Sequence, residues 1–423
     1  MNMNNYNKGA KGRRKKGGGK EGGGTGSGRG RISRPQALSN TVEDIILNMD
    51  RYNLWWTGPP DTDTFKPTEW GNTHTDSNNA IFTMAIIQGQ AHGDFRICSS
   101  PNDFKLYLGT ARKYFDGDIV IAVDAGLTED VKNVLIKYKA IVYELPHNLC
   151  AKETKSVFCG SADERVPASV FRYFFYGKWA MMYSTTSLVM FTDFRDIIFQ
   201  GNPFTYRLHE WYPEFQLVTF QEFHPNMVIN RCHFNRMIMS ECYGDDTLRL
   251  LGNRVIVSSG AALGTRDAVL AWSHYMSTQL QEAPGRMVET RCLSGGIEHA
   301  FVNWLVYGNK LRQIMKIRTF PQGEGAVNTL GGLKPDTVTA NITGNIKSFW
   351  RVLNDDGYIL NWNGDVAPVV HQLDHFHEEL QEIAEELIKN KKIIMSDGDE
   401  SKVDLMWQSL TTSRCLWGCK TVQ

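Results

Sequence analysis

Short apolar runs alternate with amphipathic segments from about residue 80 onward. The run Ala80 to Gln88 (AIFTMAIIQ) is nearly unbroken, which is typical of a strand covered on both faces. Ser100 and Pro101 then form a helix-start signal, and apolar residues recur at helical spacing from Phe104 to Phe115. The next apolar run, Asp118 to Val123, predicts a second buried strand.

The same alternation continues through a helix at Val131 to Tyr138, a strand at Ala140 to Glu144, a helix at Ser169 to Ser184 and a strand at Ser187 to Phe191. A βαβαβ order requires crossovers, so it predicts an α/β fold whose central sheet is mostly parallel, with helices on both faces. The later predicted elements are a strand at Arg254 to Val257, helices at Asp267 to Leu280 and His299 to Val306, a strand at Tyr358 to Trp362 and a final helix through Phe376 and Leu387.

The charge is distributed unevenly between the N-terminus and the rest of the chain. Residues 1–34 hold ten basic residues, one acid and eleven of the 38 glycines, so they carry +9 and leave −9 for the remainder of a chain with no net charge. Without apolar periodicity, residues 1–40 are predicted to be a disordered tail. A nucleic-acid or nuclear-import role for this tail is an alternative to a simple solvated tail, but the acidic remainder makes nucleic acid a poor partner for the main domain. Residues 78–390 are predicted to be one large domain, and residues 391–423 a C-terminal extension.

Several classes of protein are excluded. The longest apolar runs are far shorter than the ~20 residues that cross a bilayer, and the first residues lack the apolar core of a secretory signal. None of the eight cysteines falls in a CxxC pair, which excludes a zinc ribbon or thioredoxin-type motif. Disulfides and buried thiols both remain open for these cysteines.

Two acids, Asp193 and Asp196, follow the strand that ends at Phe191. In open α/β sheets, ligands bind at the carboxyl ends of strands, and two carboxylates there can hold a divalent cation with open positions for water or phosphate oxygens. On residue types alone a structural interpretation is favoured, because acids also cap loops and Arg195 can pair with one of them.

The wider segment SLVMFTDFRDIIFQGNPF resembles the metal-binding region of nucleotide-sugar glycosyltransferases with the Rossmann-related GT-A fold. It is similar in particular to a eukaryotic family with a TDxRDxxFQxxPF-like sequence. The resemblance extends, in the same order, to FRYFFYGKWA, VSSGAALGTRDAVLAW, GGIEHAFVNWLVYGNKL and GYILNWNGDVAPVVHQLDHF, over some 300 residues. The resemblance implies a GT-A-like fold in a single large domain and a glycosyltransferase that transfers a hexosyl or pentosyl group from a nucleotide sugar.

Carried over to this sequence, Asp193 and Asp196 become the acidic ligands of a Mn²⁺ or Mg²⁺ that bridges the donor diphosphate. His371, in the last block, matches a late histidine that completes the metal shell in many such enzymes. The alternative for His371 is a hydrogen-bonded structural side chain. The cation has a chemical role, because it stabilises the charge that develops on the departing nucleoside diphosphate.

Other residues are assigned to the donor. Arg172 and Lys178 are candidates for contacting the diphosphate, with Arg172 preferred because its forked donors suit two phosphates; the alternative for Arg172 is an ion pair over an aromatic face. Ser259 and Gly260 lie in the segment Ser258 to Gly264, which resembles the small-residue stretch beneath the sugar pocket, where glycine lets the backbone approach a ligand.

One position departs from the family pattern. Relatives often read Asp-Gln-Gly before the apolar helix, whereas this chain has Ser294-Gly295-Gly296, and Glu298 is the nearest catalytic substitute. The expected reaction transfers the sugar to a glycan or protein hydroxyl, with retention favoured because no general base stands out. The alternative is a catalytically weak or inactive protein that binds nucleotide or glycan. The resemblance implies a Golgi or secretory location, yet the N-terminus as given shows no anchor. Two alternatives follow: a cytoplasmic location if this N-terminus is complete, or a true start that lies further upstream.

Overall fold

The structure is a computed structural model that describes residues 66–75, 78–85, 100–145, 168–223, 227–282, 296–331, 354 and 356–373. All of them belong to the larger of two units, Ser39–Gln423. The predicted tail at 1–40, the predicted extension at 391–423 and the predicted helix through Phe376 and Leu387 lie outside the described residues.

Helices and strands alternate along the first part of the chain, as the hydrophobic pattern predicts. The helices are α2 (Pro101–Tyr114), α3 (Glu129–Lys137), α4 (Ala168–Ala180), α5 (His233–Leu251), α6 (Arg266–Glu282) and α8 (Glu298–Tyr307), with short 3₁₀ segments η4 (Leu208–Glu210) and η5 (Leu311–Gln313). The strands are β1 (Ala80–Ala85), β2 (Asp118–Asp124), β3 (Ile141–Leu145), β4 (Leu188–Thr192), β5 (Ile197–Phe199), β6 (Leu217–Gln221), β7 (Val257–Thr265), β8 (Ile317–Phe320), β9 (Val327–Thr329) and β10 (Val369–His371).

A seven-stranded sheet in the order β3-β2-β1-β4-β7-β6-β8 forms the centre of the fold. The strands β1 to β4 are parallel, β6 is parallel to β8, and β7 runs antiparallel to both β4 and β6. The carboxyl ends of every strand but β7 therefore meet at one edge, to which β7 contributes its amino end. The predicted α/β fold with a mostly parallel sheet flanked by helices is confirmed.

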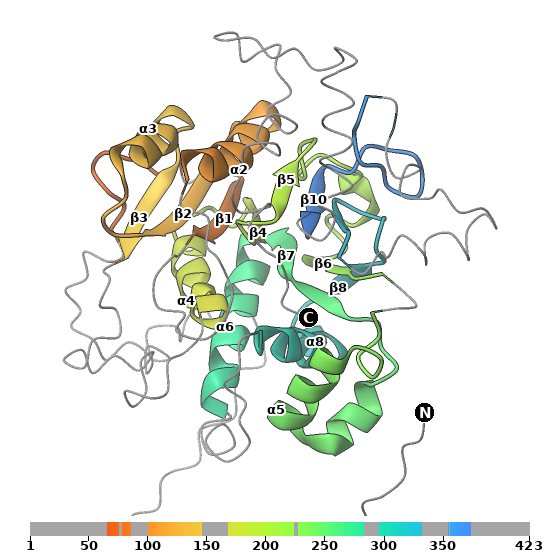
Figure 1. The fold of residues 1–423 in the computed structure, drawn as a ribbon. Coiled ribbons are helices and arrows are strands. Elements are labelled where there is room, and N and C mark those ends of the chain that lie inside the picture. Colours follow the sequence, from red (N-terminus) through yellow and green to blue (C-terminus); the bar gives the residue numbers. More distant parts are fainter. Residues whose placement is uncertain are drawn as a thin grey trace, which may run out of the picture. The chain divides into compact units, whose positions relative to one another are not determined.

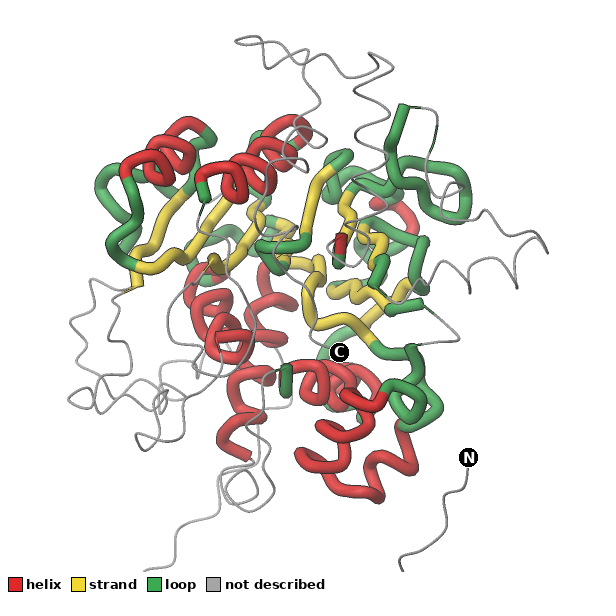
Figure 2. The backbone as a smooth tube through the Cα atoms, in the orientation of Figure 1, coloured by secondary structure: helices red, strands yellow, loops and turns green. Residues whose placement is uncertain are grey.

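Local sequence signals explain the first elements. Ser100 caps α2 in a reciprocal capping box with Asp103, and Pro101 occupies the first helical turn. All seven residues of β2 are buried, as expected for a strand covered on both faces. Figure 1 shows α2 and α3 over one face of the sheet and α4 and α6 over the other, and Figure 2 shows the same layers as red helices around yellow strands.

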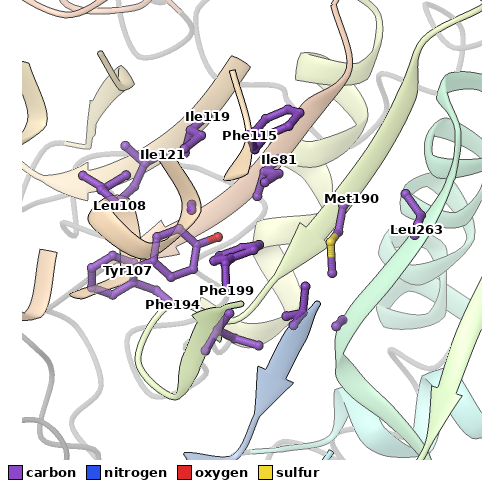
Figure 3. Packing of buried hydrophobic residues seen from close by; sticks show 14 of the residues in the cluster. Ile81, Tyr107, Leu108, Phe115, Ile119, Ile121, Met190, Phe194, Phe199 and Leu263 are labelled. Atoms are coloured by element: carbon purple, nitrogen blue, oxygen red, sulfur yellow. The ribbon is translucent and has the colours of Figure 1, made fainter. Parts of the chain in front are cut away.

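A second, three-stranded sheet stands beside the large one at the edge where the parallel strands end. Its order is β5-β10-β9, with β10 antiparallel to β5 and parallel to β9. Buried aromatic side chains fill the space between this small sheet, α2 and the large sheet. Figure 3 shows Tyr107, Phe194 and Phe199 in this cluster close to Ile81 and Met190.

The structure corrects two predicted strands. The strand predicted at Arg254 to Val257 begins instead at Val257 and continues to Thr265, so the small residues after Val257 form the central strand β7. Burial between β4 and β6 decides this, since small residues have little strand preference of their own. Tyr358 to Trp362 is not a strand: it makes one isolated bridge, Leu360 with Val366, around a turn.

Candidate metal centre

Strand pairing brings His371 next to two aspartates from a distant part of the sequence. Asp193 directly follows β4, Asp196 directly precedes β5, and His371 is the last residue of β10. Because β10 pairs with β5 so that His371 lies opposite Ile197, the histidine falls beside Asp196. One ligand atom from each of Asp193, Asp196 and His371 lies within 4.8 Å of the others, which makes this group a candidate metal site.

The distances within this group suit a shared cation. The Nε2 atom of His371 lies 3.5 Å from Oδ2 of Asp193 and 3.8 Å from Oδ2 of Asp196. Both distances exceed a normal hydrogen bond, yet both are shorter than the roughly 4.2 Å that can separate two ligands of one ion with ~2.1 Å bonds. Two carboxylates and one imidazole are also a donor set that Mn²⁺ or Mg²⁺ can accept.

The loop between Asp193 and Asp196 is held in place by Phe194. Phe194 is buried, and its ring lies 4.8 Å from that of Phe104 and 5.0 Å from that of Tyr107, both on α2. Tyr107 also hydrogen-bonds through its hydroxyl to the side chain of Thr192 at the end of β4. The apolar side chain therefore anchors the loop in the core, while the two acids on either side face the sheet edge.

Hydroxyl groups fix the orientation of His371, which is 1% exposed. Its Nδ1 atom lies 3.4 Å from Oγ of Ser258 on β7 and 3.3 Å from Oγ1 of Thr329 on β9. These contacts on Nδ1 leave Nε2 directed at the two aspartates, which is the arrangement in which a histidine ligates a metal while its other nitrogen is held by the protein.

Gly260 makes room for the cluster. A Cβ atom at this position of β7 would lie 2.3 Å from Nε2 of His371 and 2.5 Å from Oδ2 of Asp193, far inside normal contact. The backbone is also tied to the site, because the amide of Asp193 donates to the carbonyl of Gly260 over 2.6 Å. Glycine at this position therefore leaves open the space between the histidine and the aspartate.

Arg172 pairs with the cluster from the buried side. Its guanidinium forms an ion pair with Oδ1 of Asp193, and it donates to the carbonyl of Ser259 over 3.1 Å. It also lies over the ring of Tyr173, 5.2 Å from the centroid. These contacts are the ion pair over an aromatic face that the sequence left as the alternative. Because Arg172 uses Oδ1, the other carboxylate oxygen of Asp193 remains directed at His371.

Neighbouring charges shift the pKa values of these groups. Burial disfavours the charged form of Asp193, but Arg172 and His371 outweigh burial and hold the pKa of this carboxyl well below its usual value. Burial lowers the pKa of His371, but Asp196 and Asp193 outweigh it and the net shift is upward. Asp193 is therefore a negatively charged carboxylate at neutral pH, which is the form that binds a cation.

The remaining predicted site residues are distributed as follows. Ser259 and Gly260 lie on β7 beside the cluster. Lys178 follows Arg172 by six residues, or about 9 Å along α4, and its ammonium lies over the ring of Phe174 rather than at the cluster. Glu298 is buried in the first turn of α8 and accepts a hydrogen bond of 2.7 Å from Ser169 on α4.

Glu298 is also close enough to Arg172 to favour the charged form of its guanidinium. The structural alternative for the second acid, a pair between Arg195 and Asp196, is present at 3.9 Å, which is too long for a hydrogen bond. Each acid of the motif therefore has an arginine neighbour besides His371.

Sequence reasoning missed the clamp that Gln200 makes on the segment before His371. Its side-chain amide donates to the carbonyls of Ile359 and Ala367, each over 3.0 Å, and accepts from the amide of Ile359 over 2.9 Å. The signal was present, because Gln200 belongs to the FQxxPF part of the motif and its partners belong to the last similar block. The hydroxyls of Ser258 and Thr329 carried no recognisable signal.

Of the cysteines, Cys242 is disulfide-bonded and Cys232 is free. For Cys242, on α5, the disulfide alternative therefore holds rather than the buried thiol. Among the described helices, none has the length and apolar character needed to span a membrane.

Comparisons with known proteins give little further information. No family model matches the chain, and no curated protein matches it. Among solved structures, the apo form of mouse xyloside xylosyltransferase 1 is similar, with a TM-score of 0.37, 9% sequence identity and coverage of 70% of this chain and 97% of that chain. At this level the similarity does not decide the activity.

Proposed function

We propose that this chain is a metal-dependent glycosyltransferase that moves a sugar from a nucleotide-diphosphate donor to a hydroxyl of a glycan or protein. The observation that carries the proposal is the convergence of Asp193, Asp196 and His371 at the carboxyl edge of the sheet. Ligands of open α/β sheets bind at that edge. The similar sequence blocks also support it, because the aspartates and the histidine come from the two most specific of them.

The residues present fit a divalent cation. The donor atoms are two carboxylate oxygens and an imidazole nitrogen, the second nitrogen of His371 is held by hydroxyls, and a Cβ on Gly260 would fill the space beside them. When bound, Mn²⁺ or Mg²⁺ supplies Lewis-acid stabilisation to the diphosphate that departs from the sugar.

The chain's own groups prepare this site. Asp193 and Asp196 present charged oxygens, and His371 presents a fixed Nε2. Arg172 orients Asp193 by binding its Oδ1 and holds the carboxyl ionised. We propose Arg172 as a positioning residue first, because its donors already bind Asp193 and the carbonyl of Ser259.

Two further residues of the site have proposed roles. We place the donor sugar against the backbone of Ser259 and Gly260, beside the metal cluster, because Gly260 offers no side chain there. Glu298 is the proposed carboxylate that supports the reacting sugar, and its bond to Ser169 holds it in the first turn of α8. Glu298→Gln, which keeps the size of the side chain, should lower kcat and leave cation affinity unchanged; a drop in cation affinity would place it in the metal shell instead.

The decisive experiment compares wild type with Asp196→Ala. Hydrolysis and transfer of a panel of nucleotide sugars are measured with Mn²⁺, with Asp246→Ala as the matched control because Asp246 is 90% exposed and far from any strand end. We expect Asp196→Ala to lose at least 100-fold in rate and the control to match wild type. Equal rates for wild type and Asp196→Ala contradict the metal assignment.

The same panel separates the enzyme from its alternative. A nucleotide sugar that raises the melting point only with Mn²⁺, yet is never hydrolysed or transferred, supports a nucleotide-binding protein without turnover. NMR of the anomeric product tests the proposed retention of configuration.

A further inference from the structure

A fixed and exposed indole stands on the turn that leads to His371. Trp362 is 41% exposed, whereas Trp179 and Trp272 are fully buried. Apolar area in water is unfavourable at roughly 25 cal/mol per Å², so a ligand that covers this ring would gain binding energy from it.

The ring of Trp362 is held in one orientation. Its Nε1 donates to the carbonyl of Gln322 over 2.5 Å, and its backbone amide donates to the carbonyl of Gly323 over 2.9 Å. Gly323 has a φ of +73°, and a Cβ there would lie 2.2 Å from Nε1 of the indole. The glycine backbone therefore packs against the ring on one side. An aromatic surface fixed in this way loses little conformational entropy when a ligand stacks on it.

The same turn carries polar side chains. Asn363 donates to Asp365 over 2.6 Å, and the hydroxyl of Tyr206 donates to the same carboxylate over 3.1 Å. The turn is rooted in the protein by buried Asn361, whose amide donates to the carbonyl of Gly325 over 2.9 Å. Asn363 and Asp365 are exposed and retain free hydrogen-bonding capacity toward a ligand.

The turn lies at the same sheet edge as the metal cluster. The strand registers align Phe191 of β4, Ala262 of β7, Thr219 of β6 and Thr319 of β8 in one row. Three strand spacings separate the two ends of this row, or about 14 Å. Asp193 lies two residues after Phe191, at one end of this row. Gly323, against which the indole of Trp362 packs, lies four residues after Thr319, at the other end.

The chemistry of the turn selects a neutral sugar chain. The face of a pyranose ring that carries several C–H bonds stacks on an indole, while its hydroxyls bond to amide and carboxylate groups beside it. Residues 361–365 (NWNGD) contain no Lys or Arg and one acid, so they would repel a phosphate. The separation of about 14 Å between β4 and β8 corresponds to several sugar units, which suits an extended chain rather than a single sugar.

We propose that the Asn361–Asp365 turn is a remote subsite for an acceptor oligosaccharide, in which Trp362 stacks on a pyranose ring. The subsite rests on the proposed glycosyltransferase function for its biological meaning. It lies in the half of the sheet formed by β6 and β8, beyond the cation, so that a bound chain can direct its terminal hydroxyl toward the donor.

The experiment measures binding of the full chain to an array of immobilised oligosaccharides, without donor or metal. The variants are Trp362→Ala and Trp362→Phe, and the matched control is Phe234→Ala, since Phe234 is 37% exposed on α5. Thermal melting of each variant verifies folding. We expect at least a tenfold loss of binding for Trp362→Ala, a smaller loss for Trp362→Phe and none for the control.

Three results would overturn the subsite. The first is that wild type binds no oligosaccharide on the array. The second is that Trp362→Ala and Trp362→Phe bind oligosaccharides as wild type does. The third is that Trp362 is needed for binding uridine or guanosine diphosphate and not for binding oligosaccharides. Because the array requires neither metal nor turnover, its outcome is independent of the Asp196→Ala experiment. If no turnover is found but glycan binding depends on Trp362, the proposed enzymatic activity is refuted and the proposed subsite is supported.

Discussion

The replacement Gly260→Ala tests the geometry of the metal centre by adding a single methyl group. The new Cβ would lie 2.3 Å from Nε2 of His371 and 2.5 Å from Oδ2 of Asp193, which is 1.1 and 0.9 Å short of the 3.4 Å where ordinary contact begins. Neither neighbour moves freely, because hydroxyls hold His371 and Arg172 holds Asp193.

The resulting displacement is large compared with what a metal site tolerates. Ligand distances in working sites stay within about 0.2 Å of their ideal values, so a shift near 1 Å removes at least one ligand from its position. Changes to groups that merely support ligands cost 10- to 100-fold in metal affinity. We therefore expect Gly260→Ala to weaken Mn²⁺ binding by about 100-fold or more, or about 2.7 kcal/mol.

The measurement is isothermal titration of Mn²⁺ into the wild-type chain and two variants. Gly201→Ala is the matched control, because a Cβ there would meet its nearest atom, Cα of Pro368, at an ordinary 3.4 Å. The control should bind Mn²⁺ as wild type does. If Gly260→Ala also binds Mn²⁺ with wild-type affinity, the cation does not lie between His371 and Asp193, and the site as described is wrong.

Three further predictions concern stability and its pH dependence. Gln200→Leu removes three hydrogen bonds to the backbone of Ile359 and Ala367, and should lower the free energy of unfolding by about 3 kcal/mol in urea titrations; an unchanged midpoint would show that the clamp is dispensable. Burial lowers the pKa of His274 to about 4. His274 therefore binds a proton below pH 6.5 in the unfolded chain but only below about pH 4 in the folded chain. The free energy of unfolding should fall by about 2 kcal/mol between pH 8 and 5, and in His274→Gln this part of the pH dependence should be absent. Ser100→Ala should destabilise by about 1 kcal/mol through loss of the α2 cap, more than Thr128→Ala, whose side chain makes no cap bond on α3.

The parts of the fold that follow local patterns were predictable. The strands β1 to β4 and the helices between them carry their own signals: unbroken apolar runs for buried strands, capping residues and helical spacing for α2. The order of these elements forces parallel pairing, so half of the sheet follows from the sequence. Asp193 and Asp196 were placed at a strand exit by the same reasoning.

Other elements have no local signal strong enough to predict them. β5, β9 and β10 are only three residues long, and β7 is built from small residues whose strand conformation comes from burial between neighbours. The segment Tyr358 to Trp362 looked like a strand because it is almost entirely apolar. The Gln200 side chain instead takes the backbone hydrogen bonds of Ile359 that a neighbouring strand would have taken.

The sequence by itself determined which chemical groups stand at the end of β4, because an apolar strand followed by two acids is a local pattern. Only the tertiary structure decided that His371 joins them, that Arg172 binds Asp193 rather than standing free, and that Gly260 leaves space between them. The physical reason is that these contacts join segments that are separated along the chain, by 21 residues for Arg172 and Asp193 and by 175 for Asp196 and His371. Such contacts are set by packing and by strand register with partners that no short stretch of sequence contains.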